Sequence, residues 1–179
     1  MLDFNDLKAI AEKCGFTHFA PLNIRSLEFL PEVRDMCASD KCNMYGKSWS
    51  CPPACGPLEE MQNRVESFSE GLIVQTVGDI EDSYDWEGIQ ETAKKHGENF
   101  DRMWDELENG QMTVLAMGAG ACMRCETCTY PDEQCRFPDK MSSSMEACGL
   151  FVSKVCTDNA LAYNYGQDKM AFTSCFLLK

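Results

Sequence analysis

Eight of the twelve cysteines fall into two short groups, and these groups constrain the fold more than any other feature of the chain. The first quartet has the spacing C-x4-C-x8-C-x3-C and consists of Cys37, Cys42, Cys51 and Cys55. The second quartet has the spacing C-x2-C-x2-C-x6-C and consists of Cys122, Cys125, Cys128 and Cys135. Thiols this close in sequence are either crosslinked to one another or bind a metal.

The redox state of the cellular compartment indicates whether these cysteines form disulfides or bind metal. The chain begins MLDFNDLKAI, with Asp3 and Asp6 where a signal peptide needs bases, and no apolar core follows. No stretch reaches the ~18 apolar residues of a membrane span. We therefore expect a soluble, cytoplasmic protein, whose thiols are kept reduced. Because 179 residues can build a core without disulfides, the quartets predict metal sites.

The second quartet favours an iron–sulfur cluster over zinc. Three thiols at two-residue gaps can donate to three irons of one cube, whereas zinc sites usually use two separate ligand pairs. Bacterial ferredoxin motifs open with the same spacing, and in two-cluster ferredoxins the fourth cysteine ligates the other cluster. The sequence therefore predicts a [4Fe-4S]-type cluster here and leaves open which cluster Cys135 would bind. Zinc is the alternative.

The first quartet is less diagnostic. Its segment CPPACG resembles a zinc knuckle with one extra residue between Cys51 and Cys55. We favour a second [4Fe-4S]-type cluster, and zinc is a stronger alternative here than at the second quartet. The 66 residues between the quartets exclude the compact duplicated ferredoxin, so a scaffold must position the two loops.

The remaining metal-ligating residue types are predicted to have structural roles. His18 and His96 lie at no ligand spacing to a cysteine, so we expect neither to bind metal. Four cysteines stand singly in helix or strand patterns, where a free thiol packs as a small hydrophobe. These are Cys14, Cys148, Cys156 and Cys175.

The charge is concentrated in one segment. Of the formal net charge of −13, a net −8 lies in residues 79–108, which hold eleven acidic and three basic residues. Apolar residues from Trp86 to Leu107 recur at helical spacing, which predicts an amphipathic helix with an acidic outer face. That face is either merely solvated or a docking surface for a basic redox partner. The negative charge argues against nucleic acid and anionic membranes as partners.

Helix and strand patterns alternate along the chain and predict an α/β fold: a small, at least partly parallel sheet flanked by helices, with two cysteine-rich metal-binding loops. Residues 1–179 are expected to form a single domain. Ser143 followed by Glu146 reads as a capping box, so a helix is expected to begin there. The other expected helices cover 5–14, 25–36, 57–69 and 151–162. The expected strands cover 17–24, 71–78, 112–118 and 170–179.

Two segments resemble a known family. YGKSWSCPPACGPLEE and CMRCETCTYPDEQCRFPDKMSSSMEACGLFV are similar to an uncharacterised prokaryotic family of cysteine-rich predicted metal-binding proteins, a numbered domain of unknown function. The family is common in anaerobic bacteria and methanogens. The resemblance implies metal binding through the eight quartet cysteines and an anaerobic cytosolic setting, and it supplies no reaction.

Three functions remain open. The leading hypothesis is an iron–sulfur protein with two cysteine-ligated clusters that transfers electrons to or from a partner enzyme. In it, the helix expected after Ser143 would direct its positive end at a cluster. The second is a cluster-bearing enzyme or enzyme activator with an open iron site, although no catalytic residue can be assigned. The third is a zinc-stapled interaction module.

Overall fold

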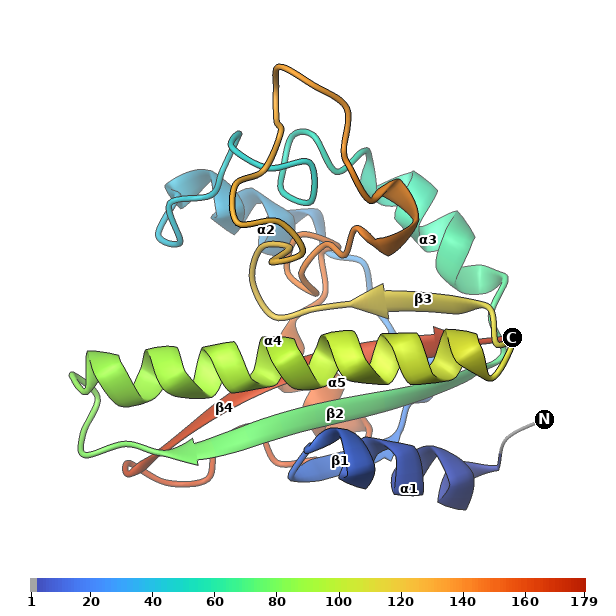
Figure 1. Cartoon of the computed structure of the whole chain (residues 1–179), viewed down its shortest axis with the longest axis vertical. Helices are drawn as coiled ribbons and strands as arrows, with labels where there is room; N and C mark the ends of the chain where they lie inside the picture. The colour runs from blue at the N-terminus through green and yellow to red at the C-terminus, as the bar shows by residue number, and fades with distance from the viewer. Residues whose placement is uncertain (1–2) are drawn as a thin grey trace.

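The computed structural model describes residues 3–179 and is built on a four-stranded sheet (Figure 1). The strands lie in the order β1-β2-β4-β3, and each neighbouring pair is antiparallel. Their bounds are β1 His18–Pro21, β2 Glu70–Asp79, β3 Val114–Met117 and β4 Lys169–Leu178.

The predicted parallel sheet is therefore wrong, although the mixed helix-and-strand class holds. A helix does connect β2 to β3, and these two strands run in the same direction because both are antiparallel to β4. They do not pair with each other, because the last strand of the chain is inserted between them. Cys175 of β4 lies opposite both Ile73 of β2 and Met117 of β3.

Helices cover both faces of the sheet. The α-helices are α1 Phe4–Cys14, α2 Pro31–Asp35, α3 Leu58–Glu66, α4 Trp86–Asn109 and α5 Val152–Asp158. Three short 3-10 helices are η1 Ile24–Ser26, η2 Met36–Ser39 and η3 Pro138–Lys140. Figure 1 shows α4 lying across one face with α1 beside it, and α5 behind the sheet. Within residues 3–179, no helix is long and apolar enough to span a bilayer.

Alternation along the strands divides the core between these two faces. Leu72 and Phe176 point toward α1 and α4 and pack with Phe100 of α4. Ile73 and Cys175 point to the opposite face, where α5 and the end of α3 pack. The long helix α4 confirms the predicted amphipathic helix, although Trp86 at its start is exposed rather than packed.

The helix expected after Ser143 does not form. Ser144 makes a parallel bridge with Gly118 at the end of β3, and the N–H of Met145 donates to the Gly118 carbonyl at 3.0 Å. The Ser144 hydroxyl accepts the N–H of Ala147, but the chain makes only one turn before Gly149 at φ 75°. Tying this segment to the sheet therefore leaves no length for a helix, and α5 begins at Val152.

The helix predicted over 25–36 is also wrong as a single element. Proline disfavours helical backbone at the residue before it, so Pro31 separates Leu30 from the helix that follows. The segment contains the short η1, an extended stretch, and then α2 with Pro31 at its first position.

His96 of α4 is a buried structural residue between the helix and the sheet. Its ring nitrogens lie 3.0 Å from the Thr76 hydroxyl and 2.7 Å from the Ser174 hydroxyl, and its ring packs against Phe16 and Phe172. Burial lowers the pKa of His96 from 6.5 to about 4. The imidazole is therefore neutral in the folded protein at neutral pH.

This burial predicts an acid-sensitive fold. In the unfolded chain His96 binds a proton below about pH 6.5, whereas in the folded chain it does so only below about pH 4. The free energy of unfolding therefore falls as the pH falls through this window. The loss from His96 alone is about 3 kcal/mol. Urea unfolding of wild type and His96→Gln at pH 7 and pH 4.5 measures it. The variant is expected to lose less stability on acidification, and equal losses would contradict the assignment.

Candidate metal centre

Both cysteine loops lie on the same side of β3 (Figure 1). The first loop follows η2, and the second follows β3 and ends at η3. They touch directly: the N–H of Cys122 donates to the Ser50 hydroxyl at 3.0 Å, and the Trp49 indole N–H donates to the Glu133 carbonyl at 3.1 Å. The fold thus brings together two cysteine quartets that are separated by 66 residues in the sequence.

All four thiols of the second quartet face one space. Cys122, Cys125, Cys128 and Cys135 line a small cavity of about 20 Å³, and all four are half-buried. Ser48, Trp49 and Ser50 of the first loop line the same cavity. The candidate metal site at the second quartet, called the second centre below, is therefore lined by residues from both cysteine loops.

The surroundings of Cys128 in this quartet favour its ionised form. Burial opposes its thiolate, but hydrogen bonding to the sulfur from the backbone N–H groups of Tyr130, Trp49 and Thr129 and from the Ser48 hydroxyl lowers its pKa below the usual 9.0. Donors directed at a cysteine sulfur also surround thiolate-ligated clusters and tune their potentials. The local environment therefore favours the thiolate, which is the form that binds metal.

The first quartet is gathered around a less polar site. Burial raises the pKa of Cys51 to about 11, and Cys42, Cys55 and Cys37 lie close enough to raise it further through their charges. Cys51 is buried, Cys37 and Cys55 are half-buried, and Cys42 is exposed. A cation such as a metal is needed to make these clustered thiols ionise together.

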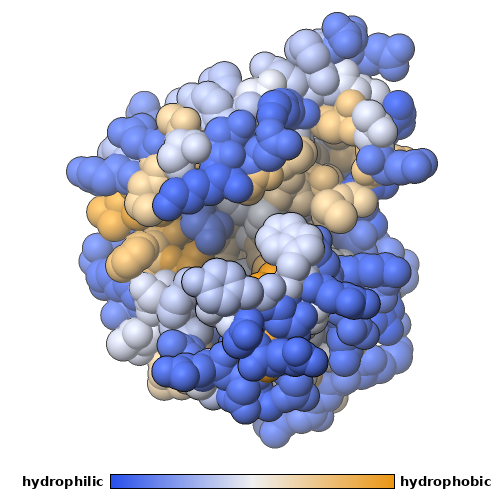
Figure 2. All heavy atoms as spheres, turned by 90° about the vertical axis from the view of Figure 1, so that its left-hand side faces the viewer, coloured by the Kyte–Doolittle hydropathy of each residue, from blue (hydrophilic) through white to orange (hydrophobic). Residues whose placement is uncertain are grey.

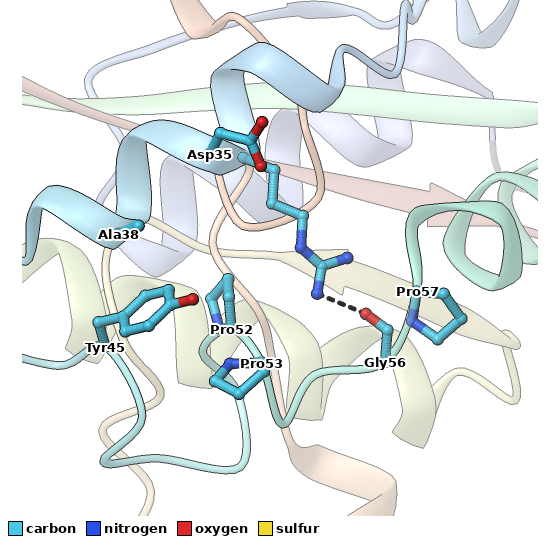
Figure 3. Close-up of a pocket in the computed structure, with 8 residues that line it drawn as sticks. Asp35, Ala38, Tyr45, Pro52, Pro53, Gly56 and Pro57 are labelled. Carbon is cyan, nitrogen blue, oxygen red and sulfur yellow. Dashed lines mark hydrogen bonds between the residues drawn. The ribbon is translucent and has the colours of Figure 1, made fainter.

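Arg34 of α2 lies against this quartet. Its guanidinium donates to the Cys55 sulfur at 3.3 Å and to the Gly56 carbonyl (Figure 3). Burial raises the pKa of Cys55, and the Arg34 charge acts against that rise. Arg34 lines a surface pocket together with Tyr45 and the Pro52-Pro53 turn, which Figure 3 shows. Sequence reasoning missed Arg34, which carries no local signal beyond being a base close to Cys37.

The thiols of each quartet lie near one another, but they do not stand at the distances of a metal site. All twelve cysteines are free, and within residues 3–179 no three side chains of histidine, cysteine, aspartate or glutamate stand at metal-binding distance from one another. The donor sets nevertheless fit a thiolate-bound group, because each contains four thiols and no histidine or carboxylate.

The acidic helix holds the second loop in place. Arg124, between the first two cysteines of that loop, lies 3.1 Å from Asp101, and Lys140 of η3 lies 2.8 Å from Asp105 and 2.7 Å from Glu108. Both cations also stack on the Trp104 ring, at 5.6 and 5.4 Å from its centroid. Some acids in the C-terminal half of the acidic face thus bind cations of the same chain and attach the second loop to α4. Sequence reasoning missed these two cations.

Comparison with known proteins places the chain in a family. Residues 20–178 match the family described as "Predicted metal-binding protein (DUF2284)". The chain belongs to this family. No curated protein and no solved structure matches it. The DUF2284 match extends well beyond both cysteine loops and includes every strand apart from the first two residues of β1. This chain is therefore a cysteine-rich member of a predicted metal-binding domain family of unknown function.

The four single cysteines of this DUF2284 protein pack in its core, as predicted. All are buried: Cys14 on the α1 side of the sheet, and Cys148, Cys156 and Cys175 on the α5 side. Burial raises the pKa of Cys148 to about 12 and raises that of Cys175 still more strongly. Neutral, buried thiols are poor metal ligands and inert nucleophiles.

Alanine substitution tests this packing role. Cys175→Ala and Cys156→Ala are each expected to leave the metal content unchanged and to cost on the order of 1 kcal/mol of stability, the loss of a small buried group. Metal analysis and denaturant unfolding of each variant measure both quantities. Loss of a whole metal equivalent from either variant would show that the ligands are wrongly assigned.

Proposed function

We propose that this protein carries two [4Fe-4S]-type clusters, one on each quartet, and transfers electrons to or from a partner enzyme in the cytoplasm of an anaerobe. The observation that supports this most is the second centre, where four thiols line one cavity and donors face the Cys128 sulfur. Three of those thiols come at the two-residue gaps that suit a cube.

The chain's own residues would set the properties of each centre. Bound clusters would supply one-electron redox chemistry. At the second centre, Ser48 and the backbone N–H groups around Cys128 favour the more reduced, more negative state and raise the potential. At the first centre, Arg34 acts on Cys55 in the same direction. Trp49 and Phe137 add aromatic side chains to the lining of the second cavity.

The partner surface proposed here is the N-terminal end of α4. In the described chain, Glu81, Glu87 and Glu91 form no ion pair, in contrast to the acids that hold Arg124 and Lys140. Tyr84 and Trp86 beside them are 90% and 70% exposed. Exposed aromatics among acids suit a basic partner, because large aromatic side chains supply contact energy and the charges steer the encounter.

Electron transfer is tested with anaerobically purified protein. Reduction by dithionite is expected to bleach the visible absorbance, produce an electron paramagnetic resonance signal and allow reduction of a basic acceptor such as cytochrome c. Because exposed charges are screened by salt, the rate should fall as ionic strength rises. A protein whose spectra do not respond to dithionite would contradict the proposal.

One observation favours a second candidate, an enzyme or activator with an open iron site. A cavity of about 450 Å³ reaches Cys37 and the exposed Cys42, and its wall includes Phe151 and Tyr163. Figure 2 shows a face where apolar side chains gather among hydrophilic ones around a hollow. An apolar cavity beside candidate ligands is where a substrate would bind. An exchangeable iron at the first centre, removable without loss of the other irons, would favour this candidate.

A further inference from the structure

The segment Ser48-Trp49-Ser50 lies between the two centres. It belongs to the first loop and leads directly into Cys51, yet all three residues line the cavity of the second quartet. Ser48 is 1% exposed and Ser50 is fully buried, which is unusual for two polar residues in a surface loop. Buried hydroxyls need partners, so their contacts show what the segment is built to hold.

The Ser50 hydroxyl touches both quartets. Its oxygen accepts the N–H of Cys122 at 3.0 Å and lies 3.8 Å from the sulfur of Cys51. It also lies 3.0 Å from the Ser48 hydroxyl, which accepts the backbone N–H of Ser50 at 3.3 Å. One oxygen atom thus joins a candidate ligand of the first centre to the backbone of a candidate ligand of the second.

Trp49 secures the other side of the second loop. Its indole N–H donates to the carbonyl of Glu133, between Cys128 and Cys135, and its ring meets Tyr130 edge-on at 4.9 Å. The second loop is therefore held at its beginning by Ser50 and near its end by Trp49. Both contacts come from residues just before Cys51, so a movement of Cys51 displaces both.

We propose that Ser48, Trp49 and Ser50 are positioning residues that couple the two centres, so that the state of the first quartet determines how firmly the second holds its metal. Residues outside the ligand set that orient it typically change metal affinity 10–100-fold when they are lost. The coupling rests on the proposed function only in requiring metal at both quartets, and it applies equally to iron–sulfur clusters and zinc.

The test uses the full-length holoprotein under anaerobic conditions, with excess chelator and a pulse of iodoacetamide. Cleavage after lysine and arginine separates the quartets, because residues 48–64 carry two cysteines of the first and residues 125–136 carry three of the second. Mass spectrometry of these peptides therefore gives a release rate for each centre. Far-UV circular dichroism shows whether each variant is folded.

Ser50→Ala and Trp49→Phe are the variants, and Ser39→Ala is the matched control. Ser39 lies in η2, just before the first loop, and among residues 3–179 its hydroxyl bonds only to the Met36 carbonyl, at 2.8 Å. Ser50→Ala is expected to speed alkylation of residues 125–136 about tenfold. Trp49→Phe keeps an aromatic ring and loses the indole donor, so it is expected to do the same more weakly. Ser39→Ala is expected to match wild type.

A reciprocal experiment isolates the coupling. Cys55→Ser weakens the first centre directly, and in the wild-type background it should also speed alkylation of residues 125–136 about tenfold. In the Ser50→Ala background the same change should add little, because the connection is already lost. If Cys55→Ser leaves the second quartet as protected as in wild type, the coupling is overturned, whichever metal is bound. If Ser50→Ala fails to fold, Trp49→Phe with Cys55→Ser gives the same answer.

Discussion

Cys135→Ser, purified anaerobically, is expected to stay folded and coloured but to lose the fourth iron of the second centre. Cys122, Cys125 and Cys128 can hold three irons of a cube, so removing the last thiolate should leave a three-iron cluster or a cube with one exchangeable iron. A zinc site that lost one of four thiolates would instead bind its metal more weakly and loosen the loop.

Electron paramagnetic resonance and iron analysis of Cys135→Ser distinguish these outcomes. The expected result is a changed signal, with impaired electron transfer and the first centre intact. Cys14→Ala is the control, because Cys14 is buried in the core beside α1 and does not line the cavity of the second quartet. A spectrum identical to wild type would mean that Cys135 is not a ligand, although it lines the cavity.

Trp104→Ala is expected to destabilise the protein more than any other single change on α4. The ring is 3% exposed, packs edge-on against Phe100 at 5.8 Å and carries Arg124 and Lys140 on its face. Removing a buried tryptophan typically costs about 3–5 kcal/mol. Loss of the Trp104 ring should also weaken the attachment of the second cysteine loop to α4, so the second centre should lose metal faster.

Trp86→Ala is the matched control on the same helix. Trp86 is 70% exposed, so its loss should change the free energy of unfolding by less than about 0.5 kcal/mol. Denaturant unfolding of the two variants measures the difference. Equal destabilisation would contradict the anchoring role of Trp104, and so would an unchanged rate of metal loss from the second centre in Trp104→Ala.

Local sequence patterns predicted the elements well and their assembly poorly. Strand and helix patterns located β2, β4 and α4, and the four single cysteines are buried as expected. Strand direction failed because it depends on β4, whose pairing spans about a hundred residues to β2 and about sixty to β3. Likewise, Ser143 and Glu146 form a valid local capping signal, but the pairing of Ser144 with Gly118 overrides it.

The sequence predicted which cysteines group together, but not which other residues surround them. Spacing alone grouped the four cysteines that line the second cavity. The residues that surround the two quartets come from elsewhere in the chain. Arg34 of α2 contacts Cys55, Ser50 of the first loop contacts Cys122, and Asp101 of the acidic helix pairs with Arg124. No motif links such residues, because side chains that meet only through the fold leave no periodic signal. The three acids that bind Arg124 and Lys140 looked like part of a solvated face for the same reason.

Metal and sulfide analysis of the anaerobically purified protein tests the central claim most directly. Two cubane clusters predict about eight irons and about eight acid-labile sulfides per chain, with a brown colour. About four irons with one zinc would confine the cluster to one quartet, and the second quartet is the one expected to keep it. Stoichiometric zinc in a colourless protein without sulfide would contradict the account.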